Sequence, residues 1–201
     1  MKLSRRFFGI VLLGIGLSAN AAWAKLSLAD ISAYVNDIKN AQSNFTQINN
    51  NGSQTTGKIF IKRPGKMRFE YNPPNKALVL ASSGRLSVHD GRSNTRPKIY
   101  PLKKTPINLI LERTVDFSKD GWVIAHEEKG AFTHITLRDP KRPELGQAEL
   151  IFSNSPVALR QWVITDRSNR RTTLLLEDLQ KTGNLPNKLF RIDLPQTNDG
   201  K

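Results

Sequence analysis

Residues 57–71 read Gly-Lys-Ile-Phe-Ile-Lys-Arg-Pro-Gly-Lys-Met-Arg-Phe-Glu-Tyr and indicate the fold class more clearly than any other stretch of the chain. Apolar and polar residues alternate on both sides of a Lys62-Arg63-Pro64-Gly65 corner. Alternation with a period of two indicates half-buried strands, and the Pro-Gly pair indicates a turn. A guanidinium at the mouth of an apolar strand pair is costly to bury unless it has hydrogen-bond partners. We therefore expect Arg63 to bond to specific acceptors.

Strand-like runs separated by short turns continue along the rest of the chain. They cover residues 43–50, 54–63, 66–72, 77–83, 85–90, 96–100, 121–128, 131–139, 147–153, 158–166, 171–178 and 188–194. Many short strands joined by tight turns are typical of an antiparallel sandwich, a barrel or a strongly curved sheet. The length is sufficient for one domain with a substantial core.

Two segments interrupt the strand pattern with helical signals. Ser27 and Asp30 form a variant capping box, and the following apolar residues at helical spacing predict an amphipathic helix of roughly 15 residues. Thr105 as N-cap and Pro106 at the first helical position predict a short, very apolar helix over 105–112. This helix either plugs one end of a barrel or is a movable lid over an apolar interior, and the sequence by itself favours the plug.

The first 24 residues have the features of a cleaved export signal. Three basic residues come first, an apolar run follows, and Ala22-Trp23-Ala24 matches a small-x-small cleavage site. The apolar run is too short for a stable membrane span. We therefore expect export, with residues 25–201 as a single mature domain and residues 195–201 as a flexible tail.

The export route has two interpretations. Ser4-Arg5-Arg6-Phe7-Phe8 fits a twin-arginine signal, which would imply folding before export. We favour ordinary Sec export, since nothing in the mature chain suggests a cofactor that is inserted in the cytoplasm.

The chain is strongly basic. The signal holds three of the 31 lysines and arginines and none of the 17 acidic residues, so the mature chain carries a net charge of +11. Such a surplus implies an anionic partner, surface or steering field. Nucleic acid is the usual interpretation, but an exported protein rarely meets it, and the basic residues are dispersed along the sequence. Anionic membrane surfaces and acidic proteins are better candidates.

The sequence contains no recognisable catalytic or metal-binding constellation. His89, His126 and His134 lie on different predicted strands, and the chain has no cysteine. Glu128 would share a strand face with His126, which provides two metal ligands and no third. There is no nucleophile elbow, P-loop or dinucleotide-binding glycine pattern. We predict a binding protein without catalytic residues, metal or cofactor.

Aromatic residues are spread at nearly one per predicted strand. They are Phe45, Phe60, Phe69, Tyr71, Trp122, Phe132, Phe152, Trp162 and Phe190. They fill the core of a barrel, or they line an apolar pocket that could take lipid chains, because acyl chains require only dry surface and shape.

Taken in order, these motifs resemble the outer-membrane lipoprotein carrier family (LolA) over nearly the whole mature chain. The matching segments are 44–47, 57–71, 72–84, 100–111 and 162–166, of which 57–71 is the strongest. Phe60 takes the place of the family's frequent Trp, and Ser82-Ser83-Gly84 lacks the usual aspartate. These departures concern the range of cargo and the partner contacts more than the fold.

The resemblance implies an incomplete antiparallel β-barrel of about eleven strands with a helical lid over a hydrophobic cavity. It implies a monomeric periplasmic chaperone that takes acylated lipoproteins from an inner-membrane ABC transporter. Delivery to the outer membrane would use a receptor there. The alternatives are a carrier of another envelope lipid and a basic, non-catalytic envelope protein that binds anionic surfaces.

The resemblance also assigns roles to individual residues. In the family, the arginine of the Lys-Arg-Pro motif bonds to the backbone of the lid and holds it shut, and this arginine is Arg63. The residues implied to contact acyl chains are Leu109, Ile110 and Leu111 in the lid and Phe60, Phe69, Tyr71 and Trp162 in the barrel.

Overall fold

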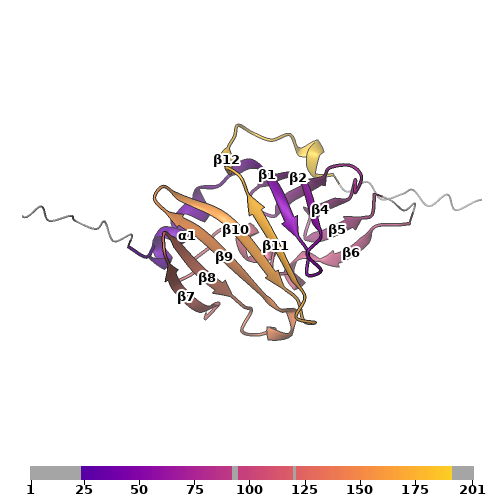
Figure 1. Cartoon of the computed structure of the whole chain (residues 1–201). Helices are drawn as coiled ribbons and strands as arrows, with labels where there is room; N and C mark the ends of the chain where they lie inside the picture. The colour runs from indigo at the N-terminus through magenta and orange to yellow at the C-terminus, as the bar shows by residue number, and fades with distance from the viewer. Residues whose placement is uncertain (1–23, 92–94, 120, 192–201) are drawn as a thin grey trace, which may run out of the picture.

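The computed structural model describes residues 24–91, 95–119 and 121–191 (Figure 1). The predicted export signal, apart from Ala24, and the predicted tail over 195–201 lie outside these ranges. Within the described ranges, no helix is both long enough and apolar enough to cross a membrane.

The described residues form one antiparallel sheet of twelve strands, and this confirms the predicted unclosed barrel. The strands are β1 (Asn40–Ile48), β2 (Gln54–Lys62), β3 (Lys66–Tyr71), β4 (Leu78–Ser82), β5 (Arg85–His89), β6 (Lys98–Pro101), β7 (Val123–Lys129), β8 (Phe132–Leu137), β9 (Gln147–Asn154), β10 (Val157–Thr165), β11 (Arg171–Leu176) and β12 (Gln180–Lys181). Their order is β6-β5-β4-β3-β2-β1-β11-β10-β9-β8-β7, and β12 pairs with β1 beside this path. β6 and β7 are therefore the two free edges of the sheet.

A single buried cluster shows that the sheet curves around its core. The cluster includes Ile59 of β2 and Phe69 of β3 as well as Ile135 of β8 and Trp162 of β10. Strands so far apart in the sheet order share one cluster only if the sheet bends back toward itself. The helix α1 (Leu28–Asp37) packs Ile31 into the same cluster and lies behind β9 and β10 in Figure 1.

The opposite face of the sheet carries a second, smaller cluster. Leu80 of β4, Leu185 and Phe190 are its buried members, and Phe60 of β2 packs against them. Because β2 alternates, Ile59 and Ile61 face the main core while Phe60 points the other way. The C-terminal segment therefore covers the outer face of the sheet, above β2 to β4.

Where the structure describes it, over 188–191, the strand predicted over 188–194 is wrong, and residues 192–194 lie outside the described ranges. Residues 187–190 form the 3-10 helix η3 (Asn187–Phe190), and the last short strand is β12 instead. Side chains of β2 and β3 satisfy the backbone of this segment in place of a neighbouring strand: Lys62 donates to the Leu185 carbonyl at 2.6 Å, and Arg68 donates to the Leu189 carbonyl at 3.0 Å. Apolar packing of Phe190 decides the conformation here.

The first predicted helix is confirmed, although it is shorter than expected. Ser27 Oγ accepts the Asp30 backbone N–H at 3.0 Å, and the Asp30 carboxylate accepts the Ser27 N–H at 3.3 Å, which completes the capping box. The helix ends at Asp37 after 10 residues because Ile38 is extended and leads directly into β1.

The second predicted helix begins later than the sequence suggested. A 3-10 turn, η1 (Leu102–Lys104), precedes it, and α2 (Asn108–Leu111) covers only four residues with Ile107 as its N-cap. The expected N-cap, Thr105, is extended and donates its hydroxyl to the Leu102 carbonyl at 2.7 Å. Its side chain therefore closes the preceding turn and does not cap α2.

Gly57 is required by the close packing of β1, β2 and β3. It faces Phe45 in the β1–β2 register, and a Cβ placed on it would lie 2.1 Å from the Glu70 carbonyl oxygen and 2.7 Å from the Phe45 ring. Real Cβ atoms do not approach backbone so closely, so β3 would have to move.

We expect Gly57→Ala to lower the free energy of unfolding by at least about 3 kcal/mol, because an overpacked core must shift its backbone. Gly183→Ala is the matched control, since a Cβ there meets no atom within 4 Å. Urea unfolding of both variants measures the difference. Equal stabilities would show that β3 accommodates the extra methyl group.

Three aromatic rings meet above Gly57. Phe45 packs edge-on against Phe69, with ring centroids 5.6 Å apart, and edge-on against Tyr71 at 5.2 Å. The Tyr71 hydroxyl donates to Gln47 Oε1 at 2.6 Å. Burial raises the pKa of the Tyr71 phenol to about 12, because the phenolate would lose its hydration in this site.

A phenol whose folded-state pKa exceeds its unfolded value stabilises the fold below the unfolded pKa and loses this effect as pH rises toward the folded pKa. We therefore expect the wild-type protein to lose stability relative to Tyr71→Phe between about pH 10 and pH 12, by about 1.4 kcal/mol per pH unit. Urea unfolding across this range measures the difference between the two proteins. A difference that does not change with pH would contradict the burial of the phenol.

Candidate functional site: the latch and the lid

Arg63 lies immediately after β2, where the chain turns toward β3. Its backbone N–H donates to the Lys39 carbonyl at 2.8 Å, which fixes the start of the turn against the end of α1. Pro64 follows in the cis conformation, and Gly65 takes a φ of 75°. The Gly65 N–H donates to the Leu111 carbonyl at 2.8 Å. The corner therefore bonds to the end of α2 through its backbone as well as through Arg63.

The Arg63 side chain bridges the C-terminal ends of two helices. Nη1 donates to the Val35 carbonyl in the last turn of α1, and Nη2 donates to the Glu112 carbonyl at 2.6 Å, where Glu112 is the C-cap of α2. Nη2 also lies 3.3 Å from Asn36 Oδ1. Carbonyls at helix C-termini lack intrahelical donors and carry partial negative charge, so a cation is favoured there.

Burial modifies this guanidinium without neutralising it. Desolvation lowers the pKa of Arg63 below its ordinary value, yet arginine remains protonated in proteins. Its Nε is buried and has no hydrogen-bond partner among the residues that the structure describes. An unmade bond of this kind costs about 1–3 kcal/mol. The closed arrangement therefore combines strong terminal bonds with one unsatisfied donor.

Arg63 bonds to two segments that cover the apolar interior, which we call the lid. One is α1, and the other runs from η1 through α2 to Phe117. The second segment buries five apolar side chains against the sheet. They are Leu102, Ile110, Leu111, Val115 and Phe117, each at most 7% exposed. The interior is thus closed by the lid's own side chains.

Six of the seven residues expected to contact acyl chains come together in this interior. Phe69, Ile110, Leu111 and Trp162 are buried members of the main cluster, and Tyr71 and Leu109 are partly buried and pack against it. Phe60 is the exception, since it lies on the outer face in the second cluster. The alternation of β2 explains this, because Ile59 and Ile61 take the inward positions.

Two adjacent pockets open beside α2. One has an empty volume of about 320 Å³ and includes Lys103, Asn108, Arg138 and Arg142 in its wall. The other has about 480 Å³ and reaches Val115 and Phe117. Both share the lining residues Leu109, Trp122 and Leu137. They therefore form one apolar floor at the edge of the lid, with basic side chains on one rim.

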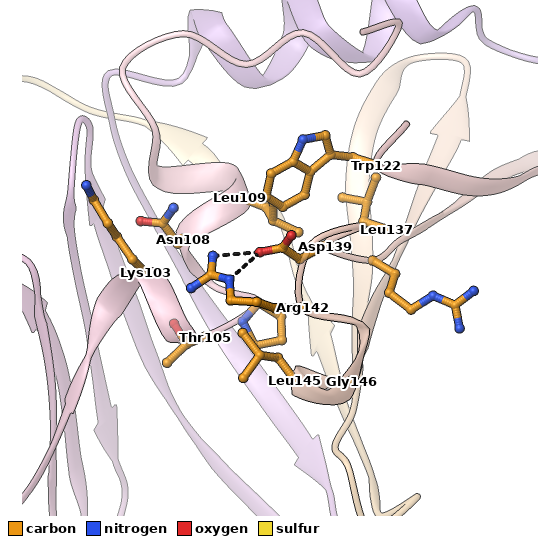
Figure 2. A pocket seen from close by; sticks show the side chains of 12 residues that line it. Lys103, Thr105, Asn108, Leu109, Trp122, Leu137, Asp139, Arg142, Leu145 and Gly146 are labelled. Carbon is orange, nitrogen blue, oxygen red and sulfur yellow. Dashed lines mark hydrogen bonds and ion pairs between the residues drawn. The ribbon is translucent and has the colours of Figure 1, made fainter. Parts of the chain in front are cut away.

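The rim of the first pocket is held in place by an ion pair. Arg142 donates to the Asp139 carboxylate through Nε at 2.8 Å and through Nη2 at 2.6 Å, and the Lys141 N–H donates to Asp139 Oδ1 at 2.9 Å. Figure 2 marks the Arg142 contacts, next to Leu109 and Trp122. Sequence reasoning listed Trp122 among the aromatic residues without assigning it to a site. The position of Trp122 in the sequence, after the 105–112 segment, gave no indication that it lines a pocket together with Leu109.

The described histidines have structural partners. His126 Nε2 lies 2.8 Å from the Leu26 carbonyl, and His134 Nδ1 lies 2.8 Å from Glu149 Oε1. Over the described ranges, no group of three His, Cys, Asp or Glu residues is placed to hold a metal ion. The geometry provides an apolar interior, two segments that cover it and an arginine that bonds to both of them.

Sequence reasoning missed two polar residues of α1. Asn36 and Ser32 lie one turn apart on the same side of the helix and bond to the backbone of residues 115–117. The one available signal was the presence of Asn in the last turn of a helix, a residue that forms helices poorly and tends to bond to nearby backbone.

The chain is similar in sequence to several known proteins. The chain is 25% identical to an uncharacterised protein, RP864, of Rickettsia prowazekii. The alignment spans 182 residues and covers 90% of this chain and 84% of that protein. It is 24% identical over 204 residues to an outer-membrane lipoprotein carrier protein of Pseudomonas paraeruginosa, which covers 97% and 96% of the two chains.

Among solved structures, a LolA superfamily protein of Nitrosomonas europaea aligns with a TM-score of 0.45 and 12% identity, over 83% of this chain and 98% of that one. The family model of the outer membrane lipoprotein carrier protein LolA matches residues 36–193, which include Arg63, the second lid segment and all twelve strands of the sheet. This chain therefore belongs to the LolA family.

Proposed function

We propose that the chain is a periplasmic carrier that receives acylated lipoproteins from an inner-membrane ABC transporter. It shields their acyl chains under the lid and delivers them to the outer membrane. One observation carries the proposal: the guanidinium of Arg63 bonds to both lid segments over an interior built from apolar side chains. Membership of the lipoprotein carrier family supports the same function.

The physical logic is competition for one apolar volume. In the closed state the lid side chains of Ile110 and Leu111 occupy the space beneath the sheet. An acyl chain that entered beside Leu109 would displace them and bury its own methylenes, each contributing about 0.8 kcal/mol. Binding would then break the Arg63 bonds, and reforming them would favour release.

The position of Leu109 suggests an entry point for cargo. It is partly buried and lines both pockets, so it separates the interior from the basic rim. Trp122, in the loop before β7, and Leu137, at the end of β8, continue the same apolar surface. An amphiphile could therefore place its chain against the floor before the lid opens.

We expect wild-type protein to bind a fluorescent triacylated lipopeptide with an affinity that hardly changes with ionic strength, because apolar burial is not screened by salt. Leu109→Glu should weaken binding at least about tenfold, since it places a carboxylate in the acyl path. Ile99→Glu is the matched control, because Ile99 lies 41% exposed on β6 and outside both pockets. Fluorescence titration at low and high salt measures all three proteins.

The outcomes separate the candidate functions. Binding that collapses at high salt would favour a protein that adheres to anionic surfaces. Equal binding of a free phospholipid and of the lipopeptide would favour a carrier of another envelope lipid.

We expect Arg63→Leu to fold and bind the lipopeptide but to transfer it to acceptor vesicles at least about tenfold more slowly. Loss of two charge-assisted bonds, each contributing about 1.5–3 kcal/mol, removes the preference for the closed state that drives release. Arg68→Leu is the control, since Arg68 also donates to a backbone carbonyl but on the outer face. Delivery by Arg63→Leu at the wild-type rate would disprove the latch role.

A further inference from the structure

Asn36 connects the two lid segments to each other. Its Nδ2 donates to the Val115 carbonyl at 2.7 Å, and its Oδ1 accepts the Val115 N–H at 2.9 Å. The amide therefore pairs with both backbone groups of one residue, as a neighbouring strand would. A flipped amide would place donor against donor and acceptor against acceptor, so the network fixes the orientation.

Ser32 makes a second connection one helical turn earlier. Its hydroxyl accepts the Phe117 N–H at 2.9 Å and donates to the Leu28 carbonyl at 2.6 Å. Ser32 is buried, and Val115 and Phe117 are each 5% exposed. Side chains of α1 thus pair with the N–H and carbonyl of Val115 and with the N–H of Phe117, in place of a strand partner.

Asn36 Oδ1 also receives Arg63 Nη2, so the joint and the latch meet at one atom. Arg63 itself contacts α1 at Val35 and the second segment at Glu112. Cutting the latch would break both of these contacts together. It would leave the bonds from Asn36 and Ser32 intact, because these run between the two lid segments and not to the sheet.

We propose that Asn36 is a positioning residue for cargo uptake and release. Its amide joins α1 to residues 113–117, so that the two segments fastened by Arg63 leave the sheet as one body. The proposal rests on the proposed carrier function. In this proposal the moving part is α1 together with residues 113–117, and not the short helix α2 alone.

Asn36→Asp separates the two roles of this side chain. The carboxylate keeps the acceptor for Arg63 and for the Val115 N–H, and the added charge strengthens the contact with the guanidinium. It loses the donor to the Val115 carbonyl and sets two oxygens against each other. If Asn36 served Arg63 alone, this variant would close the lid more firmly. If Asn36 is the joint, the two segments separate.

Distances between spin labels measure the joint directly. The chain has no cysteine, so cysteines introduced at Ala33 on α1, Arg113 in the second segment and Gln54 on β2 would be the sole labelled sites. All three positions are exposed. The measurement uses the Arg63→Leu background and no cargo, which makes it independent of lipoprotein binding.

In the Arg63→Leu background we expect the Ala33–Arg113 distance to stay at its wild-type value while both distances to Gln54 lengthen. Adding Asn36→Asp should broaden the Ala33–Arg113 distribution, and Ser32→Ala should do so to a smaller extent. Asn72→Asp is the matched control, because Asn72 also donates one amide bond, to Thr56 Oγ1 at 2.9 Å, but lies far from the lid in sequence.

Each other outcome overturns the inference. An Ala33–Arg113 distance that changes when the latch is cut would show that the segments move separately. An Asn36→Asp protein with the wild-type distribution would show that Asn36 is no joint, and unchanged distances to Gln54 would show that the pair does not leave the sheet. A wild-type protein that fails to bind the lipopeptide would contradict the proposed function instead.

Discussion

The closed structure depends on one guanidinium that serves two helix ends. Arg63 reaches carbonyls at the C-terminal ends of α1 and α2, where the partial negative charge of a helix end favours a cation. A lysine could not replace it, because an ammonium is a point charge without the planar fork that reaches two separate acceptors. Since Arg63 lies directly after β2, the strand register that places Ile59 and Ile61 in the core also sets the height of the latch above the sheet. The lid geometry therefore follows from the first hairpin.

The two faces of this hairpin have different uses. Inward positions supply the apolar interior, while Lys62, Lys66 and Arg68 all bond outward to residues of the C-terminal segment. Some of the chain's many basic side chains thus donate hydrogen bonds to backbone carbonyls and to a side-chain amide of the chain itself. This satisfies carbonyls that lack a strand partner. The basic rim at Lys103, Arg138 and Arg142 is a separate feature beside the pockets.

Much of the fold could be predicted from the sequence because alternation and turn residues are local signals. The first eleven predicted strands lie close to the observed ones, and the capping box at Ser27 is present. The need of Arg63 for specific acceptors could be inferred from the cost of burying a charge. The family resemblance implied acceptors in the lid backbone, and their location at the ends of α1 and α2 came from the structure.

Apart from the N-cap expected at Thr105, where the hydroxyl bonds three residues back to Leu102, contacts beyond the local pattern decided the errors. Phe60 belongs to an alternating strand, and periodicity does not say which of two apolar sets faces the core. Phe190 sits in a 3-10 helix because Leu80 and Leu185 bury it from elsewhere in the chain. Asn36 bonds to a residue 79 positions away, and no local pattern contains that information.

The energies indicate why a latch is useful to a protein of this kind. An acyl chain that buries about ten methylenes contributes about 8 kcal/mol, which exceeds the two latch bonds at about 1.5–3 kcal/mol each. In the proposed function, capture would therefore proceed against the latch. Release faces the opposite difficulty, because an apolar site without a competing closed state would retain its cargo. Each 1.4 kcal/mol of closed-state stability reduces the apparent affinity tenfold. A lid that closes as one body would recover the Arg63 bonds and the burial of Ile110 and Leu111 in a single step. The sum of these energies would then oppose retention of the cargo.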